Sequence, residues 1–166
     1  MRVGVIGASG AVGRELVDVL GRRAFPMTSL RLFASARSAG TKLKTPLGEA
    51  EIEPFSDAAM RDLDLALLAV SGDFAKAHAP AMVAAGVNVV DNSSAFRLQD
   101  DVPLVVPEVN AGAIGKAKLI ANPNCTTAIL VVALEPLRQA FGLKRVIVST
   151  YQAASGAGAE GMTELE

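Results

Sequence analysis

Cysteine, histidine and tryptophan are scarce in this chain of 166 residues, and their scarcity excludes several classes of protein. The sequence has one cysteine, one histidine and no tryptophan. A single cysteine rules out an internal disulfide and any metal site built from several cysteines, so we expect no bound metal. No apolar run is long enough to span a membrane, and Val3–Gly7 is too short and too rich in glycine for a signal peptide. We therefore expect a soluble, cytoplasmic protein that has no membrane partner.

An excess of charge of one sign is also absent. The 16 Lys and Arg residues nearly balance the 17 Asp and Glu residues, and the two signs are mixed along the chain. Domains that bind nucleic acid usually carry a basic surface, so we expect no nucleic-acid partner. Hydrophobic residues make up 51% of the chain, which is enough for a proper core. The length suits one domain, or one domain and the start of another.

Short apolar runs alternate with glycine-containing turns and helical patterns along the sequence. This alternation predicts an α/β fold with a Rossmann-like, doubly wound and mostly parallel sheet. A helix is expected over Phe74–Ala85, closed by Gly86. An exposed hairpin is expected over Leu43–Phe55. The expected strands are Met1–Ile6, Ser29–Ala34, Leu63–Val70, Val87–Val90, Leu104–Pro107, Lys118–Ala121 and Lys144–Gln152.

The turn Gly7–Gly13 joins the first strand to a helical pattern, which is the context that a dinucleotide-binding turn requires. Its spacing, G-x-x-G-x-x-G, is a variant of the usual G-x-G-x-x-G. Glycines at these positions allow a tight turn and a close approach of backbone to pyrophosphate. The alternative is a purely structural glycine turn. The candidate cofactor contacts here are Gly7, Ser9, Gly10, Ala11, Val12 and Gly13.

The loop after the second expected strand favours NADP over NAD. In NAD-binding folds an acidic residue near this position holds the ribose 2′-hydroxyl, but no Asp or Glu occurs between Asp18 and Glu49. The loop instead carries Ser35, Arg37 and Ser38, and a guanidinium with neighbouring hydroxyls suits a 2′-phosphate. The alternative is a solvated basic loop that binds nothing.

Polar residues follow two further expected strands. Ser71 and Gly72 end one of them, and Asn92 and Ser93 end the next. Ligands of doubly wound sheets lie beyond the carboxyl ends of the strands, so these four residues are candidate cofactor contacts. Arg97 lies in the second loop, where a guanidinium can clamp an anion.

Cys125 opens a long apolar run, Ala128–Leu134, that we interpret as a buried helix. Pro123 disfavours a helix at the residue before it, so the helix should begin at or just after Asn124. A cysteine at the positive end of a helix dipole is favoured as thiolate and can act as a nucleophile. The alternative is a small core residue, since free cysteine is often buried. His78 belongs to a different element, and we interpret it as a surface or packing residue.

Six segments stand in an order that closely resembles bacterial aspartate-β-semialdehyde dehydrogenase. They are Gly7–Gly13, Ser35–Gly40, Asp91–Arg97, Val106–Asn110, Asn122–Thr127 and Ser149–Gly158. The resemblance implies an NADP-dependent, reversible conversion of L-aspartate β-semialdehyde and inorganic phosphate to β-aspartyl phosphate. This is the branch-point step towards lysine, methionine, threonine and diaminopimelate.

The same resemblance implies roles for single residues. Cys125 would form a thioester with the aspartyl group, and Gln152 would bind the substrate or intermediate. Arg97 and Asn124 would hold the phosphate. NADP would contact Gly10–Gly13, Arg37, Ser38, Ser155 and Gly156.

The resemblance also implies a domain division and a larger protein. We expect an NADP-binding domain over 1–124 and the truncated beginning of a catalytic and dimerisation domain over 125–166. Members of the family are roughly twice this length, consistent with two domains. Their catalytic histidine, carboxylate-binding arginine and a phosphate-binding lysine would lie outside this sequence. We therefore expect the full-length protein to be a homodimer or homotetramer, and this chain to lack full activity.

Two other interpretations stay open. The sister family N-acetyl-γ-glutamyl-phosphate reductase shares the chemistry, but it typically has Gly before the cysteine and Tyr-Pro after it, where this chain has Asn124 and Thr126–Thr127. The other interpretation is a non-catalytic NADP-binding module, in which Cys125 would be an inert thiol.

Overall fold

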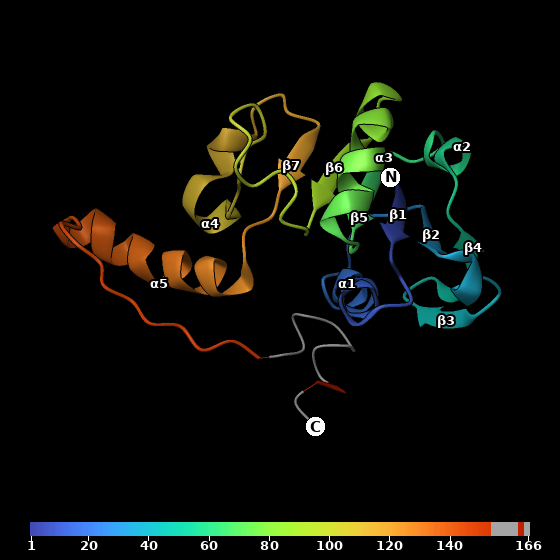
Figure 1. Ribbon diagram of the computed structural model, residues 1–166, viewed down its shortest axis with the longest axis horizontal. Coiled ribbons are helices and arrows are strands. Elements are labelled where there is room, and N and C mark those ends of the chain that lie inside the picture. The colour runs from blue at the N-terminus through green and yellow to red at the C-terminus, as the bar shows by residue number, and fades with distance from the viewer. Residues whose placement is uncertain (154–162, 165–166) are drawn as a thin grey trace.

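A seven-stranded sheet with helices on both faces forms the body of the protein (Figure 1). The computed structural model describes residues 1–153 and 163–164. The elements in order are β1 (Arg2–Ile6), α1 (Ala11–Arg22), β2 (Ser29–Ala34), η1 (Ala36–Ser38), β3 (Lys42–Thr45), β4 (Gly48–Pro54), α2 (Asp57–Met60), β5 (Leu65–Leu68), α3 (Gly72–Ala84), β6 (Asn88–Asp91), α4 (Pro107–Asn110), η2 (Ala111–Ile114), β7 (Leu119–Ala121) and α5 (Cys125–Phe141).

The strand order is β3-β4-β2-β1-β5-β6-β7, and every neighbouring pair except β3 with β4 is parallel. From β1 the chain passes through α1 to β2 on one side. It then returns past β1 to β5 and continues to β6 and β7 on the other side. The direction of winding therefore changes between β1 and β5, which is where doubly wound sheets form a crevice for ligands. The expected doubly wound, mostly parallel fold is confirmed.

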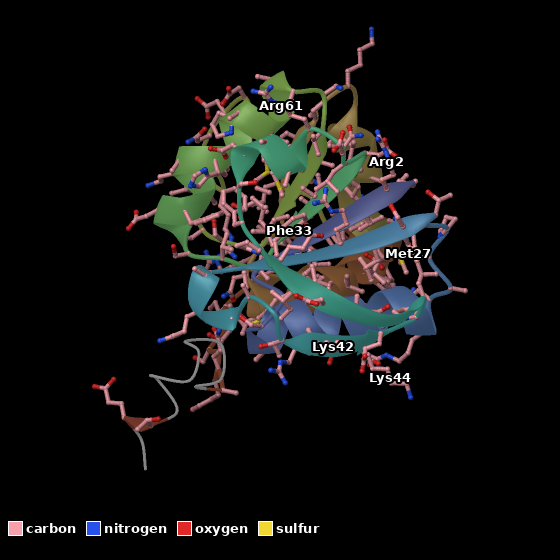
Figure 2. The ribbon with its side chains drawn as sticks, turned by 90° about the vertical axis from the view of Figure 1, so that its right-hand side faces the viewer. Arg2, Met27, Phe33, Lys42, Lys44 and Arg61 are labelled. Atoms are coloured by element: carbon pink, nitrogen blue, oxygen red, sulfur yellow. The ribbon has the colours of Figure 1, made fainter. Side chains whose placement is uncertain are left out.

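The two faces of the sheet bury separate apolar clusters. Val3 and Val5 of β1 pack with Val17 and Leu20 of α1 on one face. Residues of opposite parity on the strands, such as Ala66 and Leu68 of β5, pack with α3 on the other face. The side chain of Phe33 lies in this second cluster, in the interior of the molecule (Figure 2). This alternation follows from the two-residue period of a strand and explains why the central strands are apolar on both faces.

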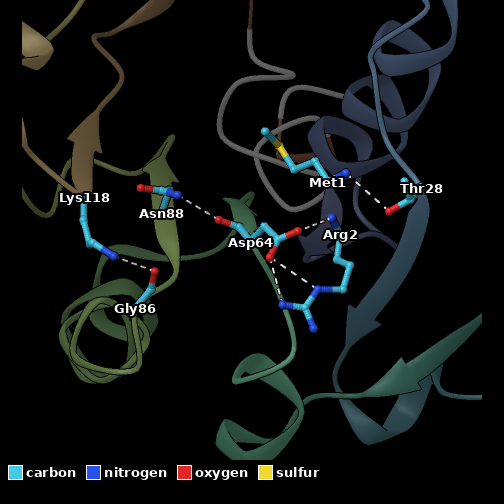
Figure 3. A network of polar contacts seen from close by, with 7 residues as sticks. All are labelled: Met1, Arg2, Thr28, Asp64, Gly86, Asn88 and Lys118. Atoms are coloured by element: carbon cyan, nitrogen blue, oxygen red, sulfur yellow. Dashed lines mark hydrogen bonds and ion pairs between the residues drawn. The ribbon is translucent and has the colours of Figure 1, made fainter.

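A polar network joins the amino-terminal ends of the central strands, opposite the ligand edge (Figure 3). Asp64 accepts hydrogen bonds from the backbone N–H of Arg2 at 2.7 Å and from its Nη2 atom at 2.8 Å. The carbonyl oxygen of Asp64 accepts from the Nδ2 atom of Asn88 at 3.0 Å. Lys118 donates to the carbonyl oxygen of Gly86 at 2.8 Å. These contacts tie the starts of neighbouring strands together: β1 with β5, β5 with β6, and β6 with β7.

The Arg2–Asp64 pair should make the stability of the fold depend on pH. The hydrogen bonds from the Arg2 side chain and backbone lower the pKa of Asp64 from 3.8 to about 2. A carboxyl whose pKa is lowered by folding stabilises the fold above its ordinary pKa, and the contribution disappears as pH falls through the folded value. We expect Asp64→Asn to lower the urea midpoint at pH 7, with a difference from the parent that shrinks as pH falls from 3.8 towards about 2.

The control for this prediction is Asp101→Asn, which removes an exposed loop carboxylate. Its urea midpoint should follow that of the parent at each pH. A constant difference between Asp64→Asn and the parent across the whole range would contradict the linkage.

The expected hairpin over Leu43–Phe55 is present, but it is not merely an exposed appendage. β3 pairs antiparallel with β4, and β4 also pairs parallel with β2. Ile52 of β4 is consequently fully buried beneath α1. The sequence could not show this, because the pairing of β4 with β2 joins residues far apart in the chain.

Two expected strands are wrong. Leu104–Pro107 forms only an isolated bridge from Leu104 to Ala121, and Pro107 begins helix α4. A proline suits the first turn of a helix, where its missing N–H is not needed. Lys144–Gln152 pairs with no strand among residues 1–153, and Ile147 is 88% exposed. An alternating sequence forms a strand only where a neighbouring strand supplies hydrogen bonds.

Helix α5 begins at Cys125, as expected, and ends at Phe141, but it is not buried. Ile129 is 73% exposed and Val132 is 40% exposed. Its principal contact is with α4, and it projects from the sheet (Figure 1). An apolar run indicates that a helix has an apolar surface to bury. It does not show that the element which covers this surface belongs to the same stretch of chain. Within the part of the chain that the structure describes, no helix is long and apolar enough to cross a membrane.

Candidate active site

The glycine turn after β1 is built so tightly that two of its positions cannot carry a side chain. Gly7 has a φ of 88°, and a Cβ atom there would lie 2.1 Å from the carbonyl oxygen of Ala69. A Cβ atom on Gly13 would lie 2.2 Å from the carbonyl oxygen of Gly7. These contacts let α1 start directly against the ends of β1 and β5, as a dinucleotide turn requires.

The amino terminus of α1 is open to a phosphate. Gly10 is its N-cap and supplies no side-chain hydrogen bond to the first turn. A Cβ atom on Gly10 would meet only the carbonyl oxygen of Gly7, at 3.4 Å. The backbone N–H groups of the first turn, which begins at Ala11, therefore make no hydrogen bond to an N-cap side chain. Uncapped N–H groups and the helix dipole together suit an anion, so these residues fit a dinucleotide pyrophosphate.

A cavity of about 260 Å³ lies beside this turn, at the point where the winding of the sheet reverses. Its walls come from the carboxyl ends of β1, β2 and β5 and from two phenylalanines that the sequence analysis missed. Phe55 directly follows β4, and Phe74 lies in the first turn of α3. The only signals that could have found them were a position after a strand end for Phe55 and a position near a helix start for Phe74. The lining residues are Ile6, Gly7, Ser9, Ala34, Ser35, Phe55, Val70, Ser71 and Phe74.

The residues predicted to select the nucleotide follow the carboxyl end of β2, and Ser35 is the one among them that lines this cavity. Ser35 is the N-cap of η1, and Arg37 and Ser38 lie within that single turn. Arg37 is exposed and makes no ion pair with any residue in the described ranges 1–153 and 163–164. By contrast with Arg37, Lys42 on the outer strand β3 (Figure 2) does form an ion pair, in which its Nζ atom lies 3.2 Å from the Oε2 atom of Glu49.

The polar residues at the ends of β5 and β6 already have partners within the protein. Ser71 caps α3 by accepting from the N–H of Phe74 at 3.3 Å. The Ser93 hydroxyl donates to the buried Asp91 carboxylate at 2.6 Å and accepts from the N–H of Ala95 at 3.1 Å. The side chains of Ser71 and Ser93 thus shape their loops, and Gly72 forms the first residue of α3.

A second network joins the ends of β6 and β7. Asn122 donates from Nδ2 to the Oδ1 atom of Asn92 at 2.8 Å. Arg97 donates from Nε to the carbonyl oxygen of Asn122 and from Nη2 to that of Asn92, both at 2.9 Å. Arg97 is therefore held at the carboxyl edge by two backbone carbonyls. Asn122, which the sequence analysis did not select, is the residue that links this network to the cysteine segment.

Cys125 is the first residue of α5 and is exposed. Asn124 is the N-cap, and its Oδ1 atom accepts from the N–H of Thr126 at 3.1 Å and from its hydroxyl at 2.6 Å. The Sγ atom of Cys125 lies 4.0 Å from the same Oδ1 atom. The interpretation of Cys125 as a core residue is wrong, because its neighbours β7 and α5 present it at the carboxyl edge of the sheet.

The remaining candidates are not brought into this group. Gln152 is exposed, and within residues 1–153 no hydrogen bond joins it to Cys125 or Arg97. Ser155 and Gly156 lie outside the described residues. His78 packs in α3 and bonds to Asp57 at 2.9 Å, which confirms its expected packing role.

The fold and these residues define a doubly wound dinucleotide-binding domain with an exposed cysteine at the ligand edge of its sheet. Comparison with known proteins makes the assignment specific. Residues 2–117 match the family described as "Semialdehyde dehydrogenase, NAD binding domain", and residues 134–166 match "Semialdehyde dehydrogenase, dimerisation domain". The chain belongs to the semialdehyde dehydrogenase family.

Similar proteins agree with this assignment. Aspartate-semialdehyde dehydrogenase of Bacillus subtilis is 46% identical over 99% of this chain and 48% of its own length. The structure of aspartate semialdehyde dehydrogenase II from Vibrio cholerae complexed with ASA has a TM-score of 0.91 and 40% identity, covering 99% of this chain and 50% of that one. The Candida albicans enzyme with NADP has a TM-score of 0.69 and 29% identity, covering 86% and 48%. This chain thus spans about half the length of the relatives it matches.

Proposed function

We propose that this chain is the nucleotide-binding, nucleophile-bearing part of an NADP-dependent enzyme that converts L-aspartate β-semialdehyde and phosphate reversibly to β-aspartyl phosphate. The observation that carries this proposal is Cys125, exposed at the first position of α5 and at the same sheet edge as the glycine turn. The relatives named aspartate-semialdehyde dehydrogenase, 46% identical over nearly the whole chain, support the substrate.

Cys125 acts as the covalent nucleophile in this proposal. Its thiolate adds to the aldehyde carbon and forms a carbon–sulfur bond. A bound NADP would supply the hydride acceptor, so loss of hydride from this carbon would leave an aspartyl thioester on Cys125. Phosphate then attacks the thioester carbonyl, and the carbon–sulfur bond breaks to return the thiolate. The first turn of α5 supports each thiolate stage, because its N–H groups and dipole favour negative charge.

Arg97 and Asn124 hold the phosphate in this proposal. Two backbone carbonyls fix the guanidinium of Arg97, so it is oriented before an anion arrives. Asn124 uses its Oδ1 atom to cap α5, which turns the amide nitrogen Nδ2 away from the helix. A guanidinium and an amide nitrogen are both donors that suit phosphate oxygens. Gln152 would bind the substrate or the thioester.

Arg37 is the residue proposed to select NADP. We expect Arg37→Ala to weaken NADP binding by about tenfold, because a charge-assisted bond to the 2′-phosphate is lost. NAD binding should stay within about twofold of the parent, since NAD has no such phosphate. Isothermal titration calorimetry with each nucleotide measures both values. Lys44→Ala, on the exposed outer strand β3, is the control. Equal losses for NADP and NAD would contradict this role.

The test of the proposed function is an assay of the complete enzyme with aspartate semialdehyde, phosphate and NADP. Formation of NADPH that needs all three is the expected result. Faster turnover of N-acetylglutamate semialdehyde would instead identify an N-acetyl-γ-glutamyl-phosphate reductase. NADP binding without turnover of either aldehyde would identify a non-catalytic module.

The chain by itself is expected to lack full activity. The only histidine, His78, is bonded to Asp57, so the thiol has no histidine base within this sequence. We propose that the base and the carboxylate-binding arginine come from the second half of a protein as long as the relatives, which would assemble as a homodimer or homotetramer. Rapid turnover by the 166-residue chain would contradict this proposal.

A further inference from the structure

A cluster of three aromatic rings stands behind the cavity beside the glycine turn. Phe55 and Phe74 contribute to the cavity wall, and their ring centroids are 4.8 Å apart with an edge-on geometry. The ring of His78 contacts both: its centroid lies 4.8 Å from that of Phe55 and 4.4 Å from that of Phe74. His78 does not itself line the cavity. It is therefore a residue that can act on the cavity only through the two phenylalanines.

The two phenylalanines belong to different elements, and their backbones are fixed at the carboxyl edge of the sheet. The N–H of Phe55 donates to the carbonyl oxygen of Ala34 at the end of β2, at 3.0 Å. The N–H of Phe74 donates to the capping hydroxyl of Ser71. Backbone bonds of this kind leave the χ angles of the rings undetermined. Neighbouring side chains must therefore decide how each ring faces the cavity.

His78 is in a position to fix the orientation of both phenylalanine rings. It lies four residues after Phe74 in α3, so the two side chains stack on one face of the helix. Its Nδ1 atom bonds to the Oδ1 atom of Asp57 in the first turn of α2, at 2.9 Å. The hydrogen bond to Asp57 thus holds one edge of the imidazole against α2. The rest of the ring contacts Phe55 and Phe74. This single side chain joins α2, α3 and the segment after β4.

We propose that His78 is a positioning residue for nucleotide binding, which it supports by fixing Phe55 and Phe74 as the apolar wall against the adenosine half of the cofactor. This inference rests on the proposed function, because it needs a dinucleotide in the cavity. The wall suits a purine ring, because it combines two aromatic rings with the apolar side chains of Ile6 and Val70.

The test measures the affinity of the chain for 2′,5′-ADP and for NADP by isothermal titration calorimetry. His78→Ala should weaken both by about fivefold, because one ring contact to each phenylalanine is lost. Equal factors for the two ligands are expected, since 2′,5′-ADP contains only the adenosine half. His78→Phe should restore both affinities to within about twofold, because it replaces the ring. His78→Leu fills the volume without a planar ring, so it should fold and still bind more weakly.

Lys76→Ala is the matched control, because Lys76 is exposed on the same helix two residues away. It should bind both ligands like the parent. Parent-like binding by His78→Leu, or failure of His78→Phe to restore the loss, would overturn the inference while leaving the proposed function intact. Absence of binding of either ligand to the parent chain would overturn the proposed function and, with it, this inference.

Discussion

Replacement of Cys125 by serine is expected to reduce kcat/KM of the complete enzyme for aspartate semialdehyde by at least about 10³-fold. A serine hydroxyl has nearly the same size as the thiol but is a far weaker nucleophile at neutral pH. The position is exposed, so the substitution should leave the fold unchanged. Steady-state NADPH formation gives the rate constant. Trapping of acyl-enzyme in the absence of phosphate, followed by mass spectrometry, shows the covalent step directly.

Two measurements distinguish lost chemistry from lost structure. NADP affinity should be unaffected by Cys125→Ser, because the glycine turn belongs to a different part of the sheet edge. Thr127→Ser, in the same helical turn, should keep activity within about twofold. Retention of more than a tenth of the parent activity by Cys125→Ser would rule out the thioester mechanism.

Gly13→Ala is expected to lower the free energy of unfolding by about 3 kcal/mol. The added Cβ atom would lie 2.2 Å from the carbonyl oxygen of Gly7 and 2.7 Å from the Cα atom of Ala8, both of which are backbone atoms. Neither can rotate away, so α1 must move back from the end of β1. The same displacement would move the first turn of α1, so NADP binding should be lost as well. Urea denaturation gives the first quantity and calorimetry the second.

Gly112→Ala is the control for Gly13→Ala. Gly112 lies in η2, where an added Cβ atom meets nothing within 4 Å. Its free energy of unfolding should stay within about 0.5 kcal/mol of the parent. If Gly13→Ala is as stable as Gly112→Ala, the close approach of helix and strand is not what requires glycine at position 13.

Local signals in the sequence were enough for most of the central sheet and for one site residue. β2 was expected over Ser29–Ala34 and is found there. Pro123 predicted that α5 begins at or just after Asn124, and it begins at Cys125, because a proline restricts the backbone of its immediate neighbour. The glycine spacing likewise marked the turn after β1, since the steric limits there concern residues close in sequence.

The predictions that failed concern features that depend on contacts between residues far apart in the chain. Lys144–Gln152 alternates like a strand, yet it finds no partner among the described residues. The apolar run of α5 predicted a buried helix, although Ile129 is 73% exposed. Phe55 and Phe74 carried no motif at all, and only the meeting of two distant segments makes them one wall.

The sequence by itself determined the class of fold, the glycine turn, the absence of an acidic residue after β2 and the helix that begins at the cysteine. Each of these depends on backbone conformation or residue type over a few consecutive positions. The tertiary structure decided that Arg97 is held by the loops of β6 and β7, that the ring of His78 contacts Phe74, and that Cys125 is exposed at the carboxyl edge of the sheet. These facts depend on which strands become neighbours, and that is set by packing across the whole sheet rather than by any one segment.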